Sequence, residues 1–479
     1  MRKHKEPLRN KPCDVMRRSA PRFNLPSYPP TPIPRIQVVY QQVAAICPDP
    51  KNPRVHSPLQ IRRIADSIRS FGFNVPVLVD GKGKIIAGHG RVLAAQSLGM
   101  VEVPTLALDH LTPQQAQAFM VADNRLTEIA TWDDQLLGEI FQELSTLDLN
   151  FRLDVTGFEL AEIDLRIEGL KDKEDDPEAA DEIPEPPSTI PVSKPGDLWL
   201  LGRHRVLCGN ALEVPSYREL MAGRKAALVF TDPPYNVPIE GHVSGLGQFH
   251  HRDFAMACGE MSADEFTDFL TAALSLAAGS SKPGSLHYIC MDWRHIEELL
   301  AAGQSVFQEF KNLCVWVKDN AGMGSFYRSQ HELIAVFKNG SAPHQNNVQL
   351  GKYGRSRSNV WHYPGVNSFG RNTEEGNLLA LHPTVKPVAL IADALMDSSS
   401  RGDLVLDPFL GSGSTLMAAE RVGRICYGLE LEPLYVDTIV RRWEAWTGRD
   451  ALHAASGTSF KARVQAALES PTHQAGEAR

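Results

Sequence analysis

The sequence predicts an α/β domain with a mostly parallel sheet, preceded by a smaller α+β domain. Apolar, strand-like runs alternate with amphipathic helical stretches from about residue 196 to 449, which is the pattern of α/β proteins. Before this region, an acidic, proline-containing stretch at 171–195 is typical of an extended linker. Because the chain has 479 residues, too many for one ordinary domain, we expect this linker to separate two.

The smaller domain is expected to span residues 35–170. Its clearest helix begins at Ser57-Pro58, a capping residue followed by a proline, and apolar side chains then recur at helical spacing. Strands are expected at 75–79 and 84–87, joined by a glycine-containing turn.

In the larger domain, apolar runs predict six strands and four helices. The strands are expected at 227–231, 286–290, 313–317, 333–337, 404–406 and 425–429. The helices are expected at 263–278, 387–396, 414–422 and 433–446. Residues 1–34, which are basic and proline-rich, and the small-residue segment 450–479 are expected to be disordered tails.

Composition argues against several classes of protein. No stretch approaches the roughly 20 apolar residues that a membrane helix needs, and the basic N-terminus has no apolar segment behind it. The seven cysteines are scattered and form no C-x-x-C pair, so we expect neither a zinc site nor a disulfide framework, and a reducing cytoplasm fits best. A net charge of −8 does not exclude nucleic acid, because basic residues gather with aromatic ones at 311–371.

A glycine-rich turn, Asp407-Pro408-Phe409-Leu410-Gly411-Ser412-Gly413, follows the strand expected at 404–406. Glycines let backbone approach a ligand closely, and a helix is expected directly after them. The next strand ends in Glu430, and in nucleotide-binding α/β units such an acid accepts hydrogen bonds from ribose hydroxyls. Leu416 stands where a dinucleotide-binding motif has its third glycine, which argues against a dehydrogenase.

A second motif, Asp232-Pro233-Pro234-Tyr235, ends the strand expected at 227–231. An exocyclic amine is a poor nucleophile because its lone pair is delocalised into the ring. The Asp232 carboxylate and the Pro233 carbonyl could accept its two hydrogens, while the prolines stiffen the turn and Tyr235 offers a face for stacking. These residues therefore predict a site that activates the amine of a nucleobase.

Together the two motifs resemble the D-P-P-Y and F-x-G-x-G motifs of adenine-N6 and cytosine-N4 DNA methyltransferases. The resemblance implies a Rossmann-like fold with S-adenosylmethionine as cofactor. Because the D-P-P-Y motif comes first, the chain is similar to the β class of this family. The residues that the resemblance places at the cofactor are Asp407, Phe409, Gly411, Gly413 and Glu430.

Two further segments resemble cofactor motifs of this family. His382-Pro383-Thr384-Val385-Lys386-Pro387 is similar to H-P-x-x-K-P, which implies that Thr384 and Lys386 help to hold the methionine end. Cys208-Gly209-Asn210 departs from the usual Cys-Gly-Asp near the cofactor's adenine. Asn210 keeps a hydrogen-bonding side chain there and loses the charge.

The β-class order implies that the target-recognition segment lies at about 318–375. The basic side chains expected to contact double-stranded DNA are Arg328, Lys338, Lys352, Arg355 and Arg357. The glycine- and histidine-rich loop 241–251 could close over a base flipped out of the duplex. A metal pair at His250-His251 is disfavoured because adjacent side chains of an extended chain point opposite ways.

The smaller domain resembles a ParB/sulfiredoxin-like domain in its Asn52-Pro53-Arg54 and Ile85-to-Arg91 segments. In ParB relatives the latter segment binds nucleotide phosphates, which implies CTP or ATP binding by Gly88, His89, Gly90 and Arg91. Sulfiredoxins have a catalytic cysteine where His89 stands, so their redox chemistry is not expected. DNA contact by this domain is an open alternative.

The sequence thus predicts a site-specific adenine-N6 DNA methyltransferase of the restriction-modification type. Cytosine-N4 methylation by the same pocket is the nearest alternative. A ParB-like DNA-binding protein with an inactive methyltransferase half is the second, although both motifs are intact. A homodimer is compatible with the sequence.

Overall fold

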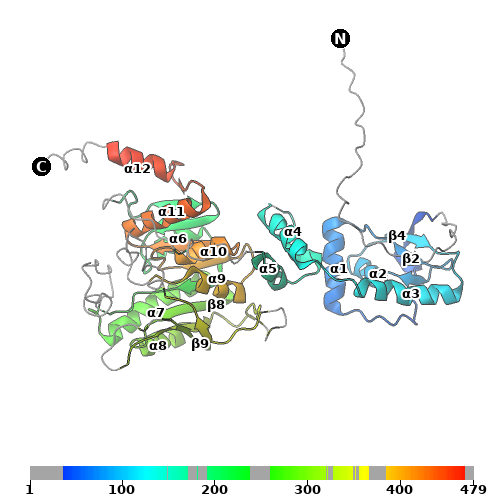
Figure 1. The fold of residues 1–479 in the computed structure, drawn as a ribbon, viewed down its shortest axis with the longest axis horizontal. Coiled ribbons are helices and arrows are strands. Elements are labelled where there is room, and N and C mark those ends of the chain that lie inside the picture. The colour runs from blue at the N-terminus through cyan, green and yellow to red at the C-terminus, as the bar shows by residue number, and fades with distance from the viewer. Residues whose placement is uncertain are drawn as a thin grey trace, which may run out of the picture. The chain divides into compact units, whose positions relative to one another are not determined.

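The computed structural model describes residues 36–147, 149–170, 181, 191–237, 259–319, 321, 327–348, 351, 355–365 and 385–469. The chain divides into two compact units, Met1–Ala130 and Thr131–Arg479 (Figure 1). The boundary therefore precedes the one that the sequence predicts at residue 170. Each unit is described by itself.

The first unit is a four-stranded sheet covered by helices. Its strand order is β1 (Val38–Gln42), β4 (Glu102–Ala107), β2 (Val77–Val79) and β3 (Ile85–Ala87), and its helices are α1 (Pro58–Phe71), α2 (His89–Ser97) and α3 (Pro113–Glu128). As the sequence predicts, α1 starts at Ser57, whose hydroxyl accepts a hydrogen bond from the Gln60 amide. Residues of β2, β3, α2 and β4 form its main core.

The second unit begins with the helices α4 (Asp134–Thr146) and α5 (Leu160–Glu168). They pack through Phe141 and Ile163, both buried. The Asp164 carboxylate of α5 lies 2.6 Å from Arg401 and 2.7 Å from Arg424. These buried ion pairs explain why the helices belong to the second unit and not to the domain that the sequence assigns them to.

The second unit is built on a ten-stranded sheet. Its order is β11 (Val360–His362), β9 (Glu309–Val317), β10 (His331–Lys338), β8 (Ser281–Met291), β7 (Ala226–Thr231), β12 (Leu404–Asp407), β13 (Ile425–Glu430), β6 (His204–Cys208), β5 (Leu198–Leu201) and β14 (Leu452–His453). The central run from β8 to β6 is parallel throughout, and β10, β5 and β14 add antiparallel pairs outside it. The predicted α/β class with a mostly parallel sheet is confirmed.

Helices cover both faces of this sheet (Figure 1). On one face lie α9 (Val388–Ser398), α10 (Ser414–Arg421) and α11 (Pro433–Thr447), whose apolar side chains share the largest core cluster with the strands. Side chains of α6 (Val214–Met221), α7 (Ala263–Gly279) and α8 (Ile296–Val306) form two other clusters with the strands. Burial on both faces is why the central strands read as continuous apolar runs.

Two segments differ from the sequence-based expectation. Residues 452–469 are part of the fold and not of a disordered tail: β14 pairs with β5, and α12 (Phe460–Glu469) buries Phe460 against Trp199. In the expected linker, Asp181 is buried and accepts a hydrogen bond from the Val388 amide at the start of α9. The N-terminal tail and most of the linker lie outside the described residues.

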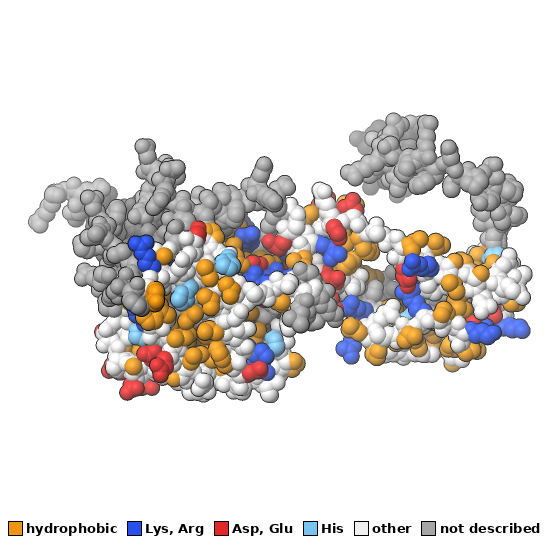
Figure 2. Space-filling view, turned by 60° about the horizontal axis from the view of Figure 1, so that its bottom comes forward, with side chains coloured by type: hydrophobic (Ala, Val, Ile, Leu, Met, Phe, Trp, Pro, Cys, Tyr) orange, Lys and Arg blue, Asp and Glu red, His pale blue; other side chains and the backbone are white. Residues whose placement is uncertain are grey.

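The surface of the described residues mixes apolar and charged side chains. Figure 2 shows hydrophobic side chains interspersed with Lys, Arg, Asp and Glu on the face in view. None of the helices in the described part of the chain is long and apolar enough to cross a bilayer.

Candidate active site

The central strands reverse their order between β7 and β12. The chain after β7 passes through α7 to β8 on one side, and the chain after β12 passes through α10 to β13 on the other. In open α/β sheets, ligands bind beyond the carboxyl ends of the strands at such a reversal. Asp232 directly follows β7 and Asp407 ends β12, so both predicted motifs lie at this point.

A hydrogen bond joins the two strand ends. The hydroxyl of Thr231 donates to Oδ1 of Asp407 over 2.8 Å, and the Phe409 amide donates to the same oxygen over 3.1 Å. Burial raises the pKa of Asp407 to about 6, against the hydroxyls of Thr415 and Thr231, which lower it. Asp407 is therefore a fixed, buried acceptor that orients the start of the glycine turn.

The glycine turn is held by Glu430 at the end of β13. The Gly411 amide donates to Oε2 of Glu430 over 2.8 Å, and the Glu432 amide donates to Oε1 over 2.9 Å. Burial raises the pKa of Glu430 to about 7, although these two amides lower it. Gly413 has φ +89°, and a side chain there would come within 3.1 Å of Ile439, so a glycine is needed at that position.

Asn210 lies beside Glu430. The Gly209 amide donates to the Glu430 carbonyl, which aligns the ends of β6 and β13. The Asn210 side-chain oxygen accepts from the Leu212 amide over 2.9 Å, and this bond orders the turn after β6. The structure thus brings Asn210, Glu430, Gly411 and Asp407 together at adjacent strand ends.

The Asp232-to-Tyr235 turn is partly buried, and its side chains contact one another. The Tyr235 hydroxyl donates to Oδ1 of Asp232 over 2.5 Å. Asn236, which the sequence does not single out, has φ +53° and binds the backbone of Gly259 and Met261 through its amide group. Asn236 therefore fixes the chain where it leaves the motif. Pro233 is buried and Pro234 half-buried.

Lys386 lies in a cluster of charged side chains beside the Asp232 turn. Its ammonium lies 2.5 Å from Oδ2 of Asp232, 3.0 Å from Oε2 of Glu332 and 3.0 Å from the Tyr235 hydroxyl. Its expected contact with the methionine end of the cofactor stays a prediction. Lys318 lies 2.5 Å from the other oxygen of Glu332. The structure therefore adds two charged residues, Glu332 and Lys318, that sequence reasoning missed.

This cluster alters the ionisation of its members. Burial raises the pKa of Asp232, and the ion pair with Lys386 opposes that rise. Burial also acts to raise the pKa of Glu332, but Lys386 and Lys318 outweigh it and lower the pKa to about 2. Burial acts to lower the pKa of Lys386, which Asp232 and Glu332 nevertheless raise. The cluster is thus two carboxylates and two ammonium groups in alternation.

Two of the predicted DNA contacts are turned into the protein. Arg355 is buried and lies 2.7 Å from Asp397, and Arg357 lies 2.8 Å from Asp393 and 2.9 Å from Asp397. They hold the segment before β11 against α9, and their guanidinium groups are already paired with carboxylates. A signal was available in the sequence, because Asp393 and Asp397 are four positions apart on a helix that is otherwise mainly apolar.

The remaining predicted DNA contacts differ in their setting. Lys338 lies 2.9 Å from Glu309. This ion pair is at the opposite end of the β9–β10 pair from Glu332. Arg328 is exposed. Lys352, Thr384, the loop 241–251 and the His250-His251 pair lie outside the described residues. In the part that the structure describes, no cluster of three or more His, Cys, Asp or Glu side chains could hold a metal ion.

In the first unit, the predicted nucleotide-binding residues lie at the start of α2. Gly88 caps the helix with φ +101°, and a side chain there would come within 3.1 Å of the Arg91 guanidinium. Arg91 donates to the Val75 carbonyl, and the His89 Nε2 accepts from the Asp49 amide. Gly90 is buried where α2 packs on α1, so its small size serves packing.

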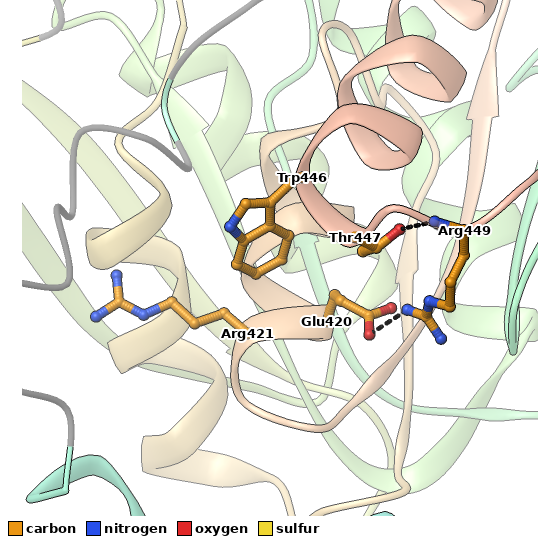
Figure 3. Close-up of a pocket in the computed structure, with 5 residues that line it drawn as sticks. All are labelled: Glu420, Arg421, Trp446, Thr447 and Arg449. Atoms are coloured by element: carbon orange, nitrogen blue, oxygen red, sulfur yellow. Dashed lines mark hydrogen bonds and ion pairs between the residues drawn. The ribbon is translucent and has the colours of Figure 1, made fainter.

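A shallow hollow lies at the carboxyl ends of α10 and α11. It is lined by Glu420, Arg421, Trp446, Thr447 and Arg449, and the Glu420 carboxylate pairs with Arg449 at 2.5 Å (Figure 3). Because α10 leads from the carboxyl end of β12 to the start of β13, this hollow lies away from the strand ends that carry Asp232 and Glu430. It is not part of the candidate active site.

The carboxylate turn and the glycine turn thus lie at the order reversal of an α/β sheet, where such sheets bind ligands. Residues 226–441 match the family model for DNA methylases. Residues 33–124 match the model for the ParB N-terminal domain, and 135–195 match that for a ParB-methyltransferase helix-turn-helix domain. The chain therefore combines an N6/N4 DNA methylase domain with a ParB-like domain.

Two relatives and one solved structure resemble parts of this chain. The ParB-like nuclease domain-containing protein YnaK of Escherichia coli (strain K12) is 45% identical over 83 residues, 17% of this chain and 95% of that protein. The type II methyltransferase M.HpaI of Haemophilus parainfluenzae is 26% identical over 263 residues, 52% of this chain and 77% of that protein. The crystal structure of M1.HpyAVI is 19% identical with a TM-score of 0.35, covering 50% of this chain and 96% of its own.

Through its methylase domain, the protein uses S-adenosylmethionine as methyl donor, and the residues at the glycine turn fit that molecule. The partly buried Glu430 carboxylate at the end of β13 could accept hydrogen bonds from ribose hydroxyls, and a side chain at Gly413 would crowd the turn. When ionised, Asp407 and Glu430 would also suit a cationic sulfonium.

Proposed function

We propose that this protein methylates the exocyclic N6 of adenine in double-stranded DNA. The observation that carries the proposal is the position of the Asp232 carboxylate at the end of β7, directly beside β12 and its glycine turn, with Thr231 bonded to Asp407. This arrangement puts an acceptor for the amine next to the turn that suits the cofactor. The Asp form of the motif favours adenine over cytosine, and cytosine-N4 is the alternative.

Asp232 and the Pro233 carbonyl would accept the two hydrogens of the amine. Both Asp232 oxygens are engaged in the described structure, Oδ1 by Tyr235 and Oδ2 by Lys386. Each carboxylate oxygen has a further acceptor position, and the Tyr235 hydroxyl can stay bonded to Glu332 when its ring turns to stack on a base. The amine then takes the place of the tyrosine hydroxyl.

Bound S-adenosylmethionine supplies an electrophilic methyl group, so a covalent link to the enzyme is not needed. After transfer the methylated amine carries an extra proton, which it readily loses. Because burial raises the pKa of Asp232, this carboxylate is a better proton acceptor than an exposed one. Lys386 keeps it ionised in the resting state.

A base in a duplex cannot reach a partly buried carboxylate, so the adenine must flip out at a cost of roughly a few kcal/mol. Among the predicted DNA contacts that the structure describes, Arg328 is exposed to solvent, and so is its neighbour Tyr327. We assign these two to the DNA-facing side, whereas Arg355 and Arg357 serve the fold.

The test is incubation of the protein with unmethylated DNA and labelled S-adenosylmethionine, followed by mass spectrometry of the nucleosides. We expect N6-methyl-2′-deoxyadenosine from the wild type and none from Asp232→Ala. Detection of N4-methyl-2′-deoxycytidine instead would show that the target is cytosine and not adenine. A wild type that makes no product, as Asp232→Ala does, would favour the binding-protein alternative.

For the ParB-like domain we propose CTP or ATP binding at the start of α2. The support is the left-handed Gly88 cap packed against Arg91, which leaves the first amides of α2 available to phosphate oxygens. Titration of the full chain with each nucleotide, with Arg91→Ala as the control, tests this. Equal binding by both proteins, or binding by neither, would contradict it.

A further inference from the structure

Four charged side chains form a row that starts at the proposed catalytic carboxylate. Asp232, Lys386, Glu332 and Lys318 alternate in sign, and successive partners lie 2.5, 3.0 and 2.5 Å apart. They come from three separate places in the chain: the end of β7, the residue before Pro387, and the β9–β10 pair. The proposed function gives a chemical role to Asp232 and to its partner Lys386, and none to Glu332 or Lys318.

The row is largely shielded from solvent. The side chains of Lys386 and Glu332 are 4% and 12% exposed, and that of Lys318 is 28% exposed. Burying charges is costly unless each has a partner in good geometry. Glu332 meets this condition by holding one lysine on each carboxylate oxygen. Glu332 therefore helps to fix the positions of both ammonium groups.

Glu332 affects Asp232 through Lys386. The Lys386 ammonium lies between the two carboxylates and contacts both. If Glu332 lost its charge, Lys386 would be drawn fully to Asp232, whose oxygens would be less available to an amine. If Lys318 lost its charge, Lys386 would be drawn toward Glu332, and Asp232 would lose its counter-charge. The charges of Glu332 and Lys318 thus determine how strongly Lys386 pairs with Asp232.

We propose that Glu332 and Lys318 are positioning residues of the methyl-transfer site, which act through Lys386 to set the orientation and the charge of Asp232. This inference rests on the proposed amine-methylating function. Lys318 directly follows β9, and its backbone bonds to Gln330 just before β10, so the row ends at the base of the hairpin that enters the predicted target-recognition segment.

The inference predicts opposite effects on the pH dependence of turnover. Removing the negative charge of Glu332 lowers the pKa of Asp232, whereas removing the positive charge of Lys386 raises it, since these are the two charges that act on it most strongly. Turnover requires ionised Asp232, so the turnover rate falls on the acid side of the pH profile; we call this fall the acid limb. The acid limb moves to lower pH in Glu332→Gln and to higher pH in Lys386→Gln and Lys318→Met. The other titratable groups that interact with Asp232 are Tyr235, Cys290 and Asp407.

The experiment measures single-turnover rates at saturating S-adenosylmethionine with unmethylated plasmid DNA, from acid to neutral pH. For Glu332→Gln we expect a rate loss on the order of 10- to 100-fold, as for a catalytic group displaced by about 1 Å, with cofactor affinity unchanged. Glu332→Asp keeps the charge and should keep the wild-type acid limb. Glu309→Gln is the matched control, because Glu309 holds Lys338 at the other end of the same strand pair.

The outcomes separate the possibilities. Opposite shifts of the acid limb in Glu332→Gln and Lys386→Gln support the inference, because a merely structural role would not give them. Wild-type rate and limb in Glu332→Gln would overturn it. Should that variant fail to fold, the more exposed Lys318→Met decides, and an unshifted limb there overturns the inference. Absence of methylated nucleoside from the wild type would remove the proposed function, and this inference with it.

Discussion

Thr231 donates a hydrogen bond to Asp407 although 176 positions separate them in the chain. Thr231 directly precedes the Asp232 turn, and Asp407 opens the glycine turn. The bond is possible because β7 and β12 are parallel neighbours, with Leu228 opposite Val405. Two motifs that are far apart in the sequence are thus joined where they begin, by the residue before the Asp232 turn and the first residue of the glycine turn. The pairing of β7 with β12 sets the distance between the reacting group and the cofactor turn.

Replacing Thr231 by valine should weaken this junction. The variant leaves Asp407 buried with one donor fewer, which costs about 1–3 kcal/mol of unfolding free energy and raises the pKa of Asp407 further. Thr231→Ser keeps the hydroxyl and is the control. Urea denaturation and S-adenosylmethionine titration measure the two effects; valine and serine variants that behave alike would contradict the argument.

Two glycine variants separate backbone strain from crowding at the cofactor turn. Gly413 and Gly402 both have positive φ, +89° and +79°, but a side chain at Gly413 meets Ile439 at 3.1 Å whereas one at Gly402 meets open space. Both alanine variants pay for the left-handed backbone, roughly 1–2 kcal/mol. Only Gly413→Ala should lose additional stability and cofactor affinity. Equal denaturation midpoints would show that the turn has room.

Strands and candidate ligands could be predicted from the sequence where a single segment contains both the apolar run and the acid that follows it. The strands β7, β12 and β13 are mainly apolar runs, and an acid stands at or directly after the end of each: Asp232, Asp407 and Glu430. Their meeting follows from parallel neighbours, because the carboxyl ends of parallel strands share one edge of the sheet.

Glu332 could not be found in this way. It is an isolated acid in an apolar strand, and its role depends on a lysine 54 positions later and on the pairing of β10 with β9. Arg355 and Arg357 were misassigned for a related reason, since composition does not distinguish an arginine that faces solvent from one that pairs with acids on a neighbouring helix. Pairing partners are a property of the fold.

The affinity for S-adenosylmethionine should depend on pH through Glu430. Its carboxyl must be ionised to accept ribose hydroxyls, and burial raises its pKa to about 7. As pH falls through that value the ligand-free protein takes up a proton that binding must displace, so affinity should fall by up to about tenfold per pH unit below pH 7. Isothermal titration across this range checks it. Glu432→Gln should keep the dependence and Glu430→Gln should remove it.

The last prediction concerns where the methyltransferase unit begins. Asp164 lies 2.6 Å from Arg401 and 2.7 Å from Arg424, and the side chains of Asp164 and Arg424 are 2% and 0% exposed. A protein that starts at residue 171 would leave both arginines without their carboxylate, whereas one that starts at residue 131 keeps it. Removing one partner of a buried ion pair typically costs about 3–5 kcal/mol, because the remaining charge is left buried and uncompensated.

We therefore expect the protein starting at 131 to fold, and Asp164→Asn and the protein starting at 171 to be strongly destabilised in urea denaturation. Asp134→Asn is the matched control: its carboxylate pairs with Arg166 on the same helix pair but is 76% exposed, so its loss should cost at most about 1 kcal/mol. If the protein starting at 171 were as stable as the one starting at 131, α4 and α5 would be an appendage and the sequence-based boundary at residue 170 would stand. The buried position of Asp164, between two arginines from different parts of the sheet-forming unit, argues for the earlier boundary.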